Sequence, residues 1–307
     1  MNRLAWNHPA LRILGATAFL LLALAAFGAN PASASPRAEC RSLPSKLLGR
    51  KVQYCILLPP SYDTDRSRRY PVVYFLHGLG QNAEAMVDSG GFNLTQDLWE
   101  QMQIGEFLIA APDGDRSFFI NSKDGKRPYE DFFIQEFLPY IEAHYRTKEG
   151  RRSRGIAGVS MGGYGALHIA LRHPDLFSAV SANSAALISN PPQGKVDAGS
   201  AAAISQALGG AFGTPFDRAF WDRNSPFTLV RENPPPAGLQ IYFDCGTEDD
   251  YGFNRGAQEF HDLLAAKHIP HEFHLYPGGH DINYFADHLP DSFQFQSKAL
   301  GATPAPK

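Results

Sequence analysis

Short runs of consecutive apolar residues recur along the chain and alternate with segments of helical spacing. A run without polar alternation, bounded by glycine, proline or polar residues, is typical of a strand buried on both faces. Such runs occupy residues 52–58, 72–76, 107–111, 154–159, 177–182, 239–244 and 272–276, and helical spacing occupies residues 129–145, 161–173 and 254–268. This alternation predicts an α/β protein with a mainly parallel sheet and helices on both faces. We expect the first strands, which short turns join, to pair antiparallel at one edge.

The first 34 residues follow a different pattern. Arg3 and Arg12 flank the start of an apolar run over residues 13–27, and the segment closes on the small residues of Ala32-Ser33-Ala34. This is the layout of a secretory signal peptide. The run is short for a membrane span, which needs about 20 residues. We expect cleavage, a secreted or periplasmic protein and no stable membrane partner; a retained anchor is the alternative.

The remaining chain is expected to form one domain over residues 35–300, followed by a disordered tail at 301–307. Residues 183–236 fit the strand–helix alternation poorly, because they contain a Gly- and Ala-rich stretch and three successive prolines. We interpret them as an insertion with one or two short helices above the carboxyl ends of the strands. A surface loop is an equal alternative for the first half.

Composition narrows the function classes only slightly. Hydrophobic residues make up 44% of the chain, charged residues 19%, and the formal net charge is −3. Nothing suggests the concentrated basic face that a nucleic-acid partner requires. The chain has no HExxH, paired CxxC or EF-hand pattern, so no metal or other cofactor is expected. No feature indicates an oligomeric state.

The predicted export bears on the redox state of the three cysteines. Cys40 and Cys55 flank a segment with Pro44 and Gly49, typical of two short strands joined by a turn. In an oxidising compartment these two would form a disulfide across the hairpin, with three unpaired cysteines as the alternative. Cys245 lies inside an apolar run and is predicted to be a buried free thiol.

The strongest chemical signal is Gly158-Val159-Ser160-Met161-Gly162, between a predicted strand and a predicted helix. A nucleophilic serine at such a junction sits on a strained turn that projects its hydroxyl into a cleft. Small residues on both sides allow that turn. The N-terminus of the following helix favours developing negative charge. We therefore predict Ser160 as a nucleophile, against a purely structural Gly-Ser turn.

A serine hydroxyl needs a base, which a carboxylate orients, in the chain order serine, acid, histidine. His280 is the best base, because it follows the last predicted strand in the Gly-rich stretch YPGGHD. His271 and His274 lie in or beside that strand, whereas His268 and His288 suit helix surfaces. The acid should follow the penultimate strand, which disfavours Asp244. The remaining acids there are Glu248, Asp249 and Asp250; Asp249 is favoured, but spacing alone does not separate it from Asp250.

An acyl-transfer site also needs donors for an oxyanion. The residue after the nucleophile, Met161, supplies one backbone N–H. The loop after the strand at 72–76, with the sequence FLHGLG, supplies the second, and Leu79 is the expected donor.

Five motifs of the chain, taken in order, resemble the putative esterase family of α/β-hydrolases: YFLHGLG, APDG, GVSMGGYGAL, DCGTEDDYGF and YPGGHD. That family includes S-formylglutathione hydrolases, feruloyl and acetylxylan esterases and mycolyltransferases, and the likeness covers roughly residues 52–295. It implies the α/β-hydrolase fold with Ser160, Asp249 and His280 as the triad and Leu79 and Met161 as oxyanion donors. Val159 and Tyr164 replace histidines of the S-formylglutathione hydrolases, and RSFFINS and GGHD look more like the secreted polysaccharide esterases.

Aromatic residues that follow the strands are candidates for the substrate pocket, because such folds bind ligands at the carboxyl ends of their strands. They are Phe118, Phe119, Tyr129, Trp221 and Tyr251, with Phe227, Tyr284 and Phe285 as further candidates. For each of them ordinary core or loop packing is the favoured alternative. The predicted function is a secreted serine ester hydrolase acting on a small or polymer-linked ester, such as feruloyl or acetyl esters of polysaccharide. The alternatives are a mycolyltransferase-type acyltransferase, an S-formylglutathione hydrolase and a non-catalytic binding protein on the same fold.

Overall fold

The computed structural model describes residues 36–191, 206–235 and 238–304. Within these residues eight strands form one sheet in the order β1-β2-β4-β3-β5-β6-β7-β8. The strands are β1 (Arg37–Pro44), β2 (Lys51–Leu58), β3 (Val72–Leu76), β4 (Leu108–Pro112), β5 (Arg154–Val159), β6 (Ala179–Asn183), β7 (Gln240–Gly246) and β8 (Glu272–Tyr276). In this spatial order, every pair of neighbours from β4 to β8 is parallel. At the β1 edge of the sheet, β1 pairs antiparallel with β2, and β2 pairs antiparallel with β4. The predicted fold class is confirmed.

The side chains of β3 explain why its sequence is apolar at every position. Successive side chains of a strand point to opposite faces of the sheet. Val72, Tyr74 and Leu76 pack into one hydrophobic core, and Val73 and Phe75 pack into a second core on the other face. A strand covered on both faces therefore has no polar side to show in its pattern.

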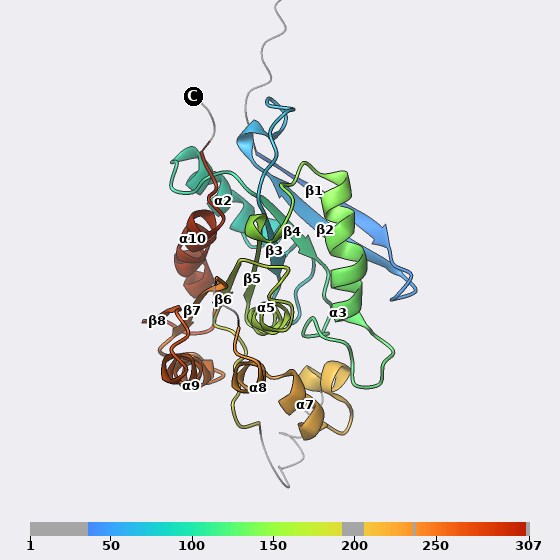
Figure 1. Ribbon diagram of the computed structural model, residues 1–307, viewed down its shortest axis with the longest axis vertical. Helices are drawn as coiled ribbons and strands as arrows, with labels where there is room; N and C mark the ends of the chain where they lie inside the picture. Colours follow the sequence, from blue (N-terminus) through green and yellow to red (C-terminus); the bar gives the residue numbers. More distant parts are fainter. Residues whose placement is uncertain (1–35, 192–205, 236–237, 305–307) are drawn as a thin grey trace, which may run out of the picture. The chain divides into compact units, whose positions relative to one another are not determined.

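Helices supply the cover on each face (Figure 1). One face is covered by α3 (Tyr129–Phe132), which continues through a π-helical segment (Phe133–Phe137) into α4 (Leu138–His144), and by α5 (Met161–Arg172), α8 (Pro226–Glu232) and α9 (Phe253–Ala266). The other face is covered by α2 (Gly91–Glu100) and α10 (Ile282–Ala299). Short helical segments complete the assignment: η1 (Pro60–Tyr62), α1 (Ala85–Asp88), η3 (Arg151–Ser153) and α7 (Arg218–Asn224). The sequence predicted the helices at α3–α4, α5 and α9, but not α2 or α10.

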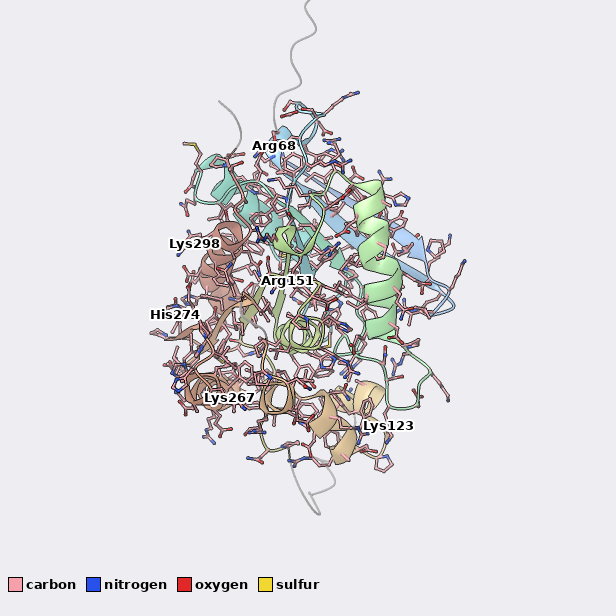
Figure 2. The ribbon with its side chains drawn as sticks, viewed as in Figure 1. Arg68, Lys123, Arg151, Lys267, His274 and Lys298 are labelled. Carbon is pink, nitrogen blue, oxygen red and sulfur yellow. A yellow bond between two sulfur atoms is a disulfide. The ribbon has the colours of Figure 1, made fainter. Side chains whose placement is uncertain are left out.

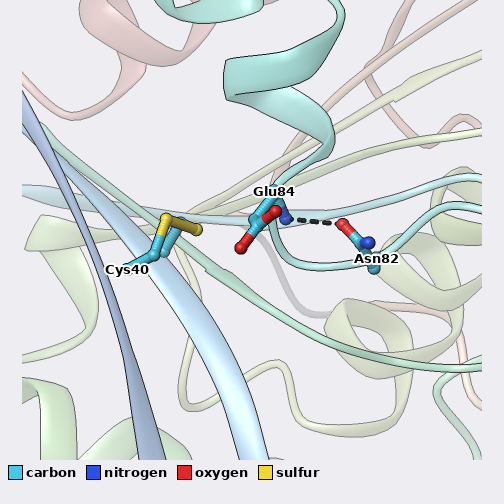
Figure 3. The surroundings of a disulfide bond; sticks show 4 residues. Cys40, Asn82 and Glu84 are labelled. Carbon is cyan, nitrogen blue, oxygen red and sulfur yellow. Dashed lines mark hydrogen bonds between the residues drawn. A yellow bond between two sulfur atoms is a disulfide. The ribbon is translucent and has the colours of Figure 1, made fainter.

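The antiparallel edge is a hairpin with a covalent link. The register of β1 and β2 places Cys40 directly opposite Cys55. The structure joins the two cysteines by a disulfide, which Figure 3 shows. Cys245, in β7, is a buried free thiol.

Residues 183–236, predicted as an insertion, contain α7, α8 and a helical stretch at 206–212. Residues 192–205 and 236 of this segment lie outside the described residues, as do the predicted signal segment and residues 305–307. Lys123, from the loop after β4, forms an ion pair with Asp217, the N-cap of α7, and Figure 2 shows it beside that helix. This contact ties the insertion to the loops at the carboxyl ends of the strands.

The start of the C-terminal tail is not the disordered segment that the sequence suggested. The Thr303 carbonyl accepts the Glu106 N–H at 2.9 Å and the Arg68 guanidinium at 2.7 Å, so residues 301–304 pack against the domain. Within the described part of the chain, no helix combines the length and the apolar character needed to cross a membrane.

Candidate active site

Ser160 lies on the tight turn between β5 and α5. Its backbone has φ 53° and ψ −115°, a conformation that is costly for a residue with a Cβ and persists only where the surroundings impose it. A Cβ on Gly158 would lie 2.3 Å from the Gly162 carbonyl oxygen, and a Cβ on Gly162 would lie 2.0 Å from the Leu76 carbonyl oxygen. The close packing of the turn therefore requires both glycines of the G-x-S-x-G motif.

Two loops bring a histidine and a carboxylate to this serine. His280 follows β8 and Asp249 follows β7, the neighbouring strand. His280 Nε2 lies 2.9 Å from Ser160 Oγ, and His280 Nδ1 lies 2.7 Å from Asp249 Oδ2. Because a carboxylate only accepts, Nδ1 carries the proton and Nε2 is left to accept from the Ser160 hydroxyl. The structure thus brings together the three side chains that the sequence singled out.

The Asp249 carboxylate is buried but well supplied with donors. Burial opposes its ionisation, yet the His280 hydrogen bond and charge, with the backbone N–H groups of Phe253 and Tyr251, outweigh burial and lower its pKa. Asp249 Oδ1 accepts those N–H groups at 3.2 Å and 3.0 Å. An ionised Asp249 holds the imidazole in one tautomer and one orientation.

Aromatic rings pack around the His280 imidazole. Tyr251, Phe253 and Phe285 each meet it edge to face, at interplanar angles of 87°, 77° and 87°. Edge-to-face contacts of this kind are favourable and directional. They leave the imidazole little freedom to rotate out of line with Ser160. Tyr251 and Phe285 were among the predicted pocket residues, but Phe253 was not. Phe253 is the first residue of α9, and no apolar pattern in the sequence reveals that position.

The competing acids occupy other positions. Asp244 is buried within β7, where it accepts hydrogen bonds from Asn183 at 2.6 Å and Tyr284 at 2.8 Å. Burial dominates these bonds and raises its pKa to about 7. Glu248 and Asp250 are exposed, and neither bonds to His280 within the described residues.

The competing histidines are also elsewhere. His271 Nε2 lies 2.8 Å from His261 Nδ1, in a pair between β8 and α9. His274 is exposed on β8, His268 is exposed after α9, and His288 stacks on Tyr276 from α10. None of these rings hydrogen-bonds to Ser160 in the part of the chain that the structure describes.

Leu79 and Met161, the expected oxyanion donors, line the same cavity as Ser160. Met161 is the first residue of α5, where an N–H has no partner within the helix, and Leu79 lies in the loop after β3. Neither N–H donates to an acceptor among residues 36–191, 206–235 and 238–304. Two free donors next to a serine hydroxyl are what a developing oxyanion needs.

His77 holds the peptide that carries the Leu79 N–H, and the Gln81 side chain holds the peptide before it; the sequence alone pointed to neither residue. His77 Nδ1 donates to the Gly78 carbonyl at 2.8 Å, while His77 Nε2 accepts the Gly114 N–H at 2.8 Å. Gln81 Oε1 accepts the Gly78 N–H at 2.9 Å. The carbonyl of Gly78 and the N–H of Leu79 belong to one planar unit and point in opposite directions. Fixing the carbonyl therefore aims the N–H.

The cavity at this site has a volume of about 500 Å³ and an apolar wall. Among the described residues, its polar lining side chains are those of Gln81, Ser160, His280 and Tyr251, and no Asp, Glu, Lys or Arg side chain lines it. The lining residues are Gly78, Leu79, Gln81, Phe118, Val159, Ser160, Met161, Ala186, Ile188, Ala207, Leu208, Tyr251, Phe253, His280 and Phe285. In the described residues, no group of three or more His, Cys, Asp or Glu side chains is arranged to hold a metal ion.

Of the predicted pocket aromatics, Phe118, Tyr251 and Phe285 line this cavity. The others are corrected. Phe119 and Tyr129 are core residues: their rings pack edge to face, and the Tyr129 hydroxyl donates to the Asp113 carbonyl. Trp221 is buried in the insertion, where it packs on Phe212 and Tyr164. Phe227 and Tyr284 are likewise buried, and neither lines the cavity. These side chains are apolar, as a pocket lining would be, but they pack in the hydrophobic core instead.

The sheet order, the strained serine turn and the loops after β7 and β8 define the α/β-hydrolase fold. More narrowly, the chain belongs to the putative esterase family, whose model matches residues 45–295.

An esterase of Mycobacterium tuberculosis is 32% identical over 250 residues, which cover 73% of this chain and 51% of the relative. An endo-1,4-beta-xylanase/feruloyl esterase of Xylanibacter ruminicola is 31% identical over 140 residues, covering 43% of this chain and 19% of that protein. A solved ferulic acid esterase has a TM-score of 0.74 at 29% identity and covers 86% of this chain and 99% of its own. The chain thus spans about half the length of the curated esterases that it matches.

Proposed function

We propose that the protein is a serine carboxylic-ester hydrolase in which Ser160, His280 and Asp249 form the catalytic triad. The observation that carries this proposal is the 2.9 Å contact between Ser160 Oγ and His280 Nε2, with Asp249 bonded to the opposite ring nitrogen. Membership of the putative esterase family supports the reaction class.

The mechanism is a double displacement. His280 Nε2 takes the proton of Ser160 as Oγ attacks the ester carbonyl, and the Asp249 carboxylate stabilises the imidazolium. The N–H groups of Met161 and Leu79 donate to the oxyanion. His280 then returns its proton to the departing alcohol oxygen, leaving Ser160 acylated. Water attacks the acyl-enzyme with His280 again as base, which releases the carboxylic acid and restores Ser160.

The substrate class that the cavity fits best is an ester with an uncharged, apolar acyl group, such as a feruloyl or acetyl ester of polysaccharide. An apolar cavity of this size accommodates an aromatic acyl group, and Phe118 and Phe285 offer ring contacts. The similarity to the ferulic acid esterase and to the xylanase/feruloyl esterase supports the feruloyl alternative.

Export is part of the proposal. The positive, apolar and small-residue regions of the first 34 residues are typical of a signal peptide. A disulfide such as Cys40–Cys55 persists in an oxidising compartment. We therefore propose that the enzyme works outside the cytoplasm. Detection of the mature N-terminus by mass spectrometry of the exported protein tests this point, and an intact segment would contradict it.

Ser160→Ala tests the chemistry. The variant should fold like the wild type but lose p-nitrophenyl acetate turnover and covalent labelling by a fluorophosphonate. Ser67→Ala, at an exposed serine far along the chain from the motif, is the matched control and should keep both. Activity that survives in folded Ser160→Ala, or labelling of another residue, would overturn the assignment.

Activity and labelling assays of the same kind separate the alternative functions. An acyltransferase would divide its acyl group between water and an added alcohol acceptor, and the ratio of acid to new ester measures this. An S-formylglutathione hydrolase must bind a charged tripeptide, for which the described residues of the cavity wall offer no Asp, Glu, Lys or Arg side chain. A non-catalytic binding protein would show neither turnover nor labelling.

A further inference from the structure

The alcohol half of an ester must lie next to His280 in the proposed reaction. The imidazole gives its proton to the leaving oxygen, so that oxygen must come within hydrogen-bond distance of Nε2. The side chains around the open edge of the His280 ring are therefore the ones that meet the alcohol group. Any residue there selects substrates by their alcohol and not by their acyl group.

Tyr251 is the residue with the most open surface at this position. Its side chain is 69% exposed, more than any other large hydrophobic residue in the described part of the chain, yet it lines the cavity of Ser160. Its ring centroid lies 4.9 Å from that of His280, with the two rings nearly perpendicular. An aromatic ring with this much exposed surface forgoes the free energy that burial of its apolar area would contribute.

The orientation of the Tyr251 ring is fixed on one side. Phe253 stacks against it at 5.4 Å between centroids and 22° between planes. The Tyr251 N–H donates to Asp249 Oδ1 at 3.0 Å, which holds the backbone of the loop. Phe253 thus packs against the Tyr251 ring, while most of the residue's surface stays exposed.

A flat, open aromatic face fits one kind of alcohol particularly well. A sugar ring presents C–H groups on one face, which pack on an aromatic ring, while its hydroxyl groups stay in water. An alkyl chain instead needs a groove that covers it on several sides. A charged alcohol would find no Asp, Glu, Lys or Arg side chain among the described residues of the cavity wall.

We propose that Tyr251 is a specificity-determining platform on which the sugar ring of the leaving alcohol stacks. This inference rests on the proposed function, because it places the leaving oxygen by the role of His280. It assigns the alcohol half of the substrate to a sugar, whichever acyl group the cavity takes.

The test compares esters that share one acyl group: methyl ferulate, 1-feruloylglycerol and 5-O-feruloyl-arabinose. If the wild type hydrolyses acetyl esters faster, the set is methyl acetate, monoacetin and methyl 2-O-acetyl-xylopyranoside. The measured quantity is kcat/KM for the sugar ester divided by kcat/KM for the methyl ester. In Tyr251→Ala this ratio should fall about three- to tenfold, the range of one aromatic contact. Tyr251→Phe, which keeps the ring, should preserve the ratio.

Each outcome decides the proposal. Leu47→Ala, at an exposed apolar residue in the turn between β1 and β2, is the matched control and should leave the ratio unchanged. An unchanged ratio in Tyr251→Ala, or an equal loss in Tyr251→Phe, would overturn the platform. A loss as large for the glycerol ester would show that the contact is not specific for a sugar ring. Failure of the proposed function is seen separately, as absent Ser160-dependent turnover of the methyl ester by the wild type.

Discussion

Asp249 Oδ2 lies 2.7 Å from His280 Nδ1, whereas the next residue, Asp250, is exposed and makes no hydrogen bond to that ring in the described residues. Asp249→Asn should lower kcat by about 10⁴, because an amide favours the wrong imidazole tautomer. Asp250→Asn is the matched control and should stay within about twofold of the wild type. Steady-state kinetics with p-nitrophenyl acetate measures both. Equal losses in the two variants would contradict the assignment of the acid.

The Gln81 side chain accepts the Gly78 N–H and so holds the peptide directly before the one that presents the Leu79 N–H. Gln81→Leu keeps a similar volume but removes the acceptor, so the loop loses one of its two restraints. We expect kcat to fall about tenfold with little change in KM, less than the 10²–10³ lost when an oxyanion donor is removed outright. Pre-steady-state kinetics of acylation measures the effect. A change confined to KM would assign Gln81 to substrate binding instead.

Asp244 should make the protein less stable at alkaline pH. Its pKa is raised to about 7 by burial, from 3.8. For a carboxyl group this stabilisation is complete below the unfolded-state pKa and is lost as the pH rises through about 7. Between pH 5 and pH 8 the loss from this group amounts to about 2–3 kcal/mol. Asp244→Asn, which resembles the protonated form, should remove that part of the pH dependence.

Urea unfolding at pH 5 and pH 8 measures this for the wild type and for Asp244→Asn. The other titrating groups are the same in both proteins, so the difference between the two pH dependences isolates Asp244. Identical pH dependence in the two proteins would mean that the carboxyl is not buried as described.

The Cys40–Cys55 disulfide closes a loop with a sequence separation of 15 residues. In the chain-entropy model a loop of this length stabilises the folded state by about 3 kcal/mol. The double variant Cys40→Ala, Cys55→Ala should lose about this amount while its esterase activity persists, because the hairpin lies at the edge of the sheet away from the triad. Thermal unfolding with and without reductant checks the cause: reductant should destabilise the wild type and leave the double variant unaffected.

The parallel sheet could be predicted because each central strand is buried on both faces, which leaves an unbroken apolar run. The helix α10 could not, because Pro290 lies inside it. A proline in a helix interior normally breaks or kinks the helix, so the sequence argues against the structure that forms. There, packing of residues such as Leu289 and Phe293 into the core outweighs the local preference.

The triad was accessible to sequence reasoning because its residues follow predictable strands in a fixed chain order. The pocket wall was not. Phe118 and Phe119 are adjacent, equally apolar and both buried in the core, yet of the two only Phe118 also lines the cavity. Both have positive φ values, 54° and 57°, so neither strand nor helix periodicity sets their directions. Likewise, only the folded loop shows that His77 and Gln81 hold the two successive peptides that meet at Gly78.

The three triad side chains follow β5, β7 and β8, and Ser160 and His280 are 120 residues apart. Parallel strands need long connections, so their pairing comes late in folding. In a growing or unfolded polypeptide, Ser160 therefore has no histidine next to it to act as its base. In the proposed mechanism hydrolysis needs His280 beside Ser160, so the catalytic centre is complete only when β8 is paired with β7 in the sheet.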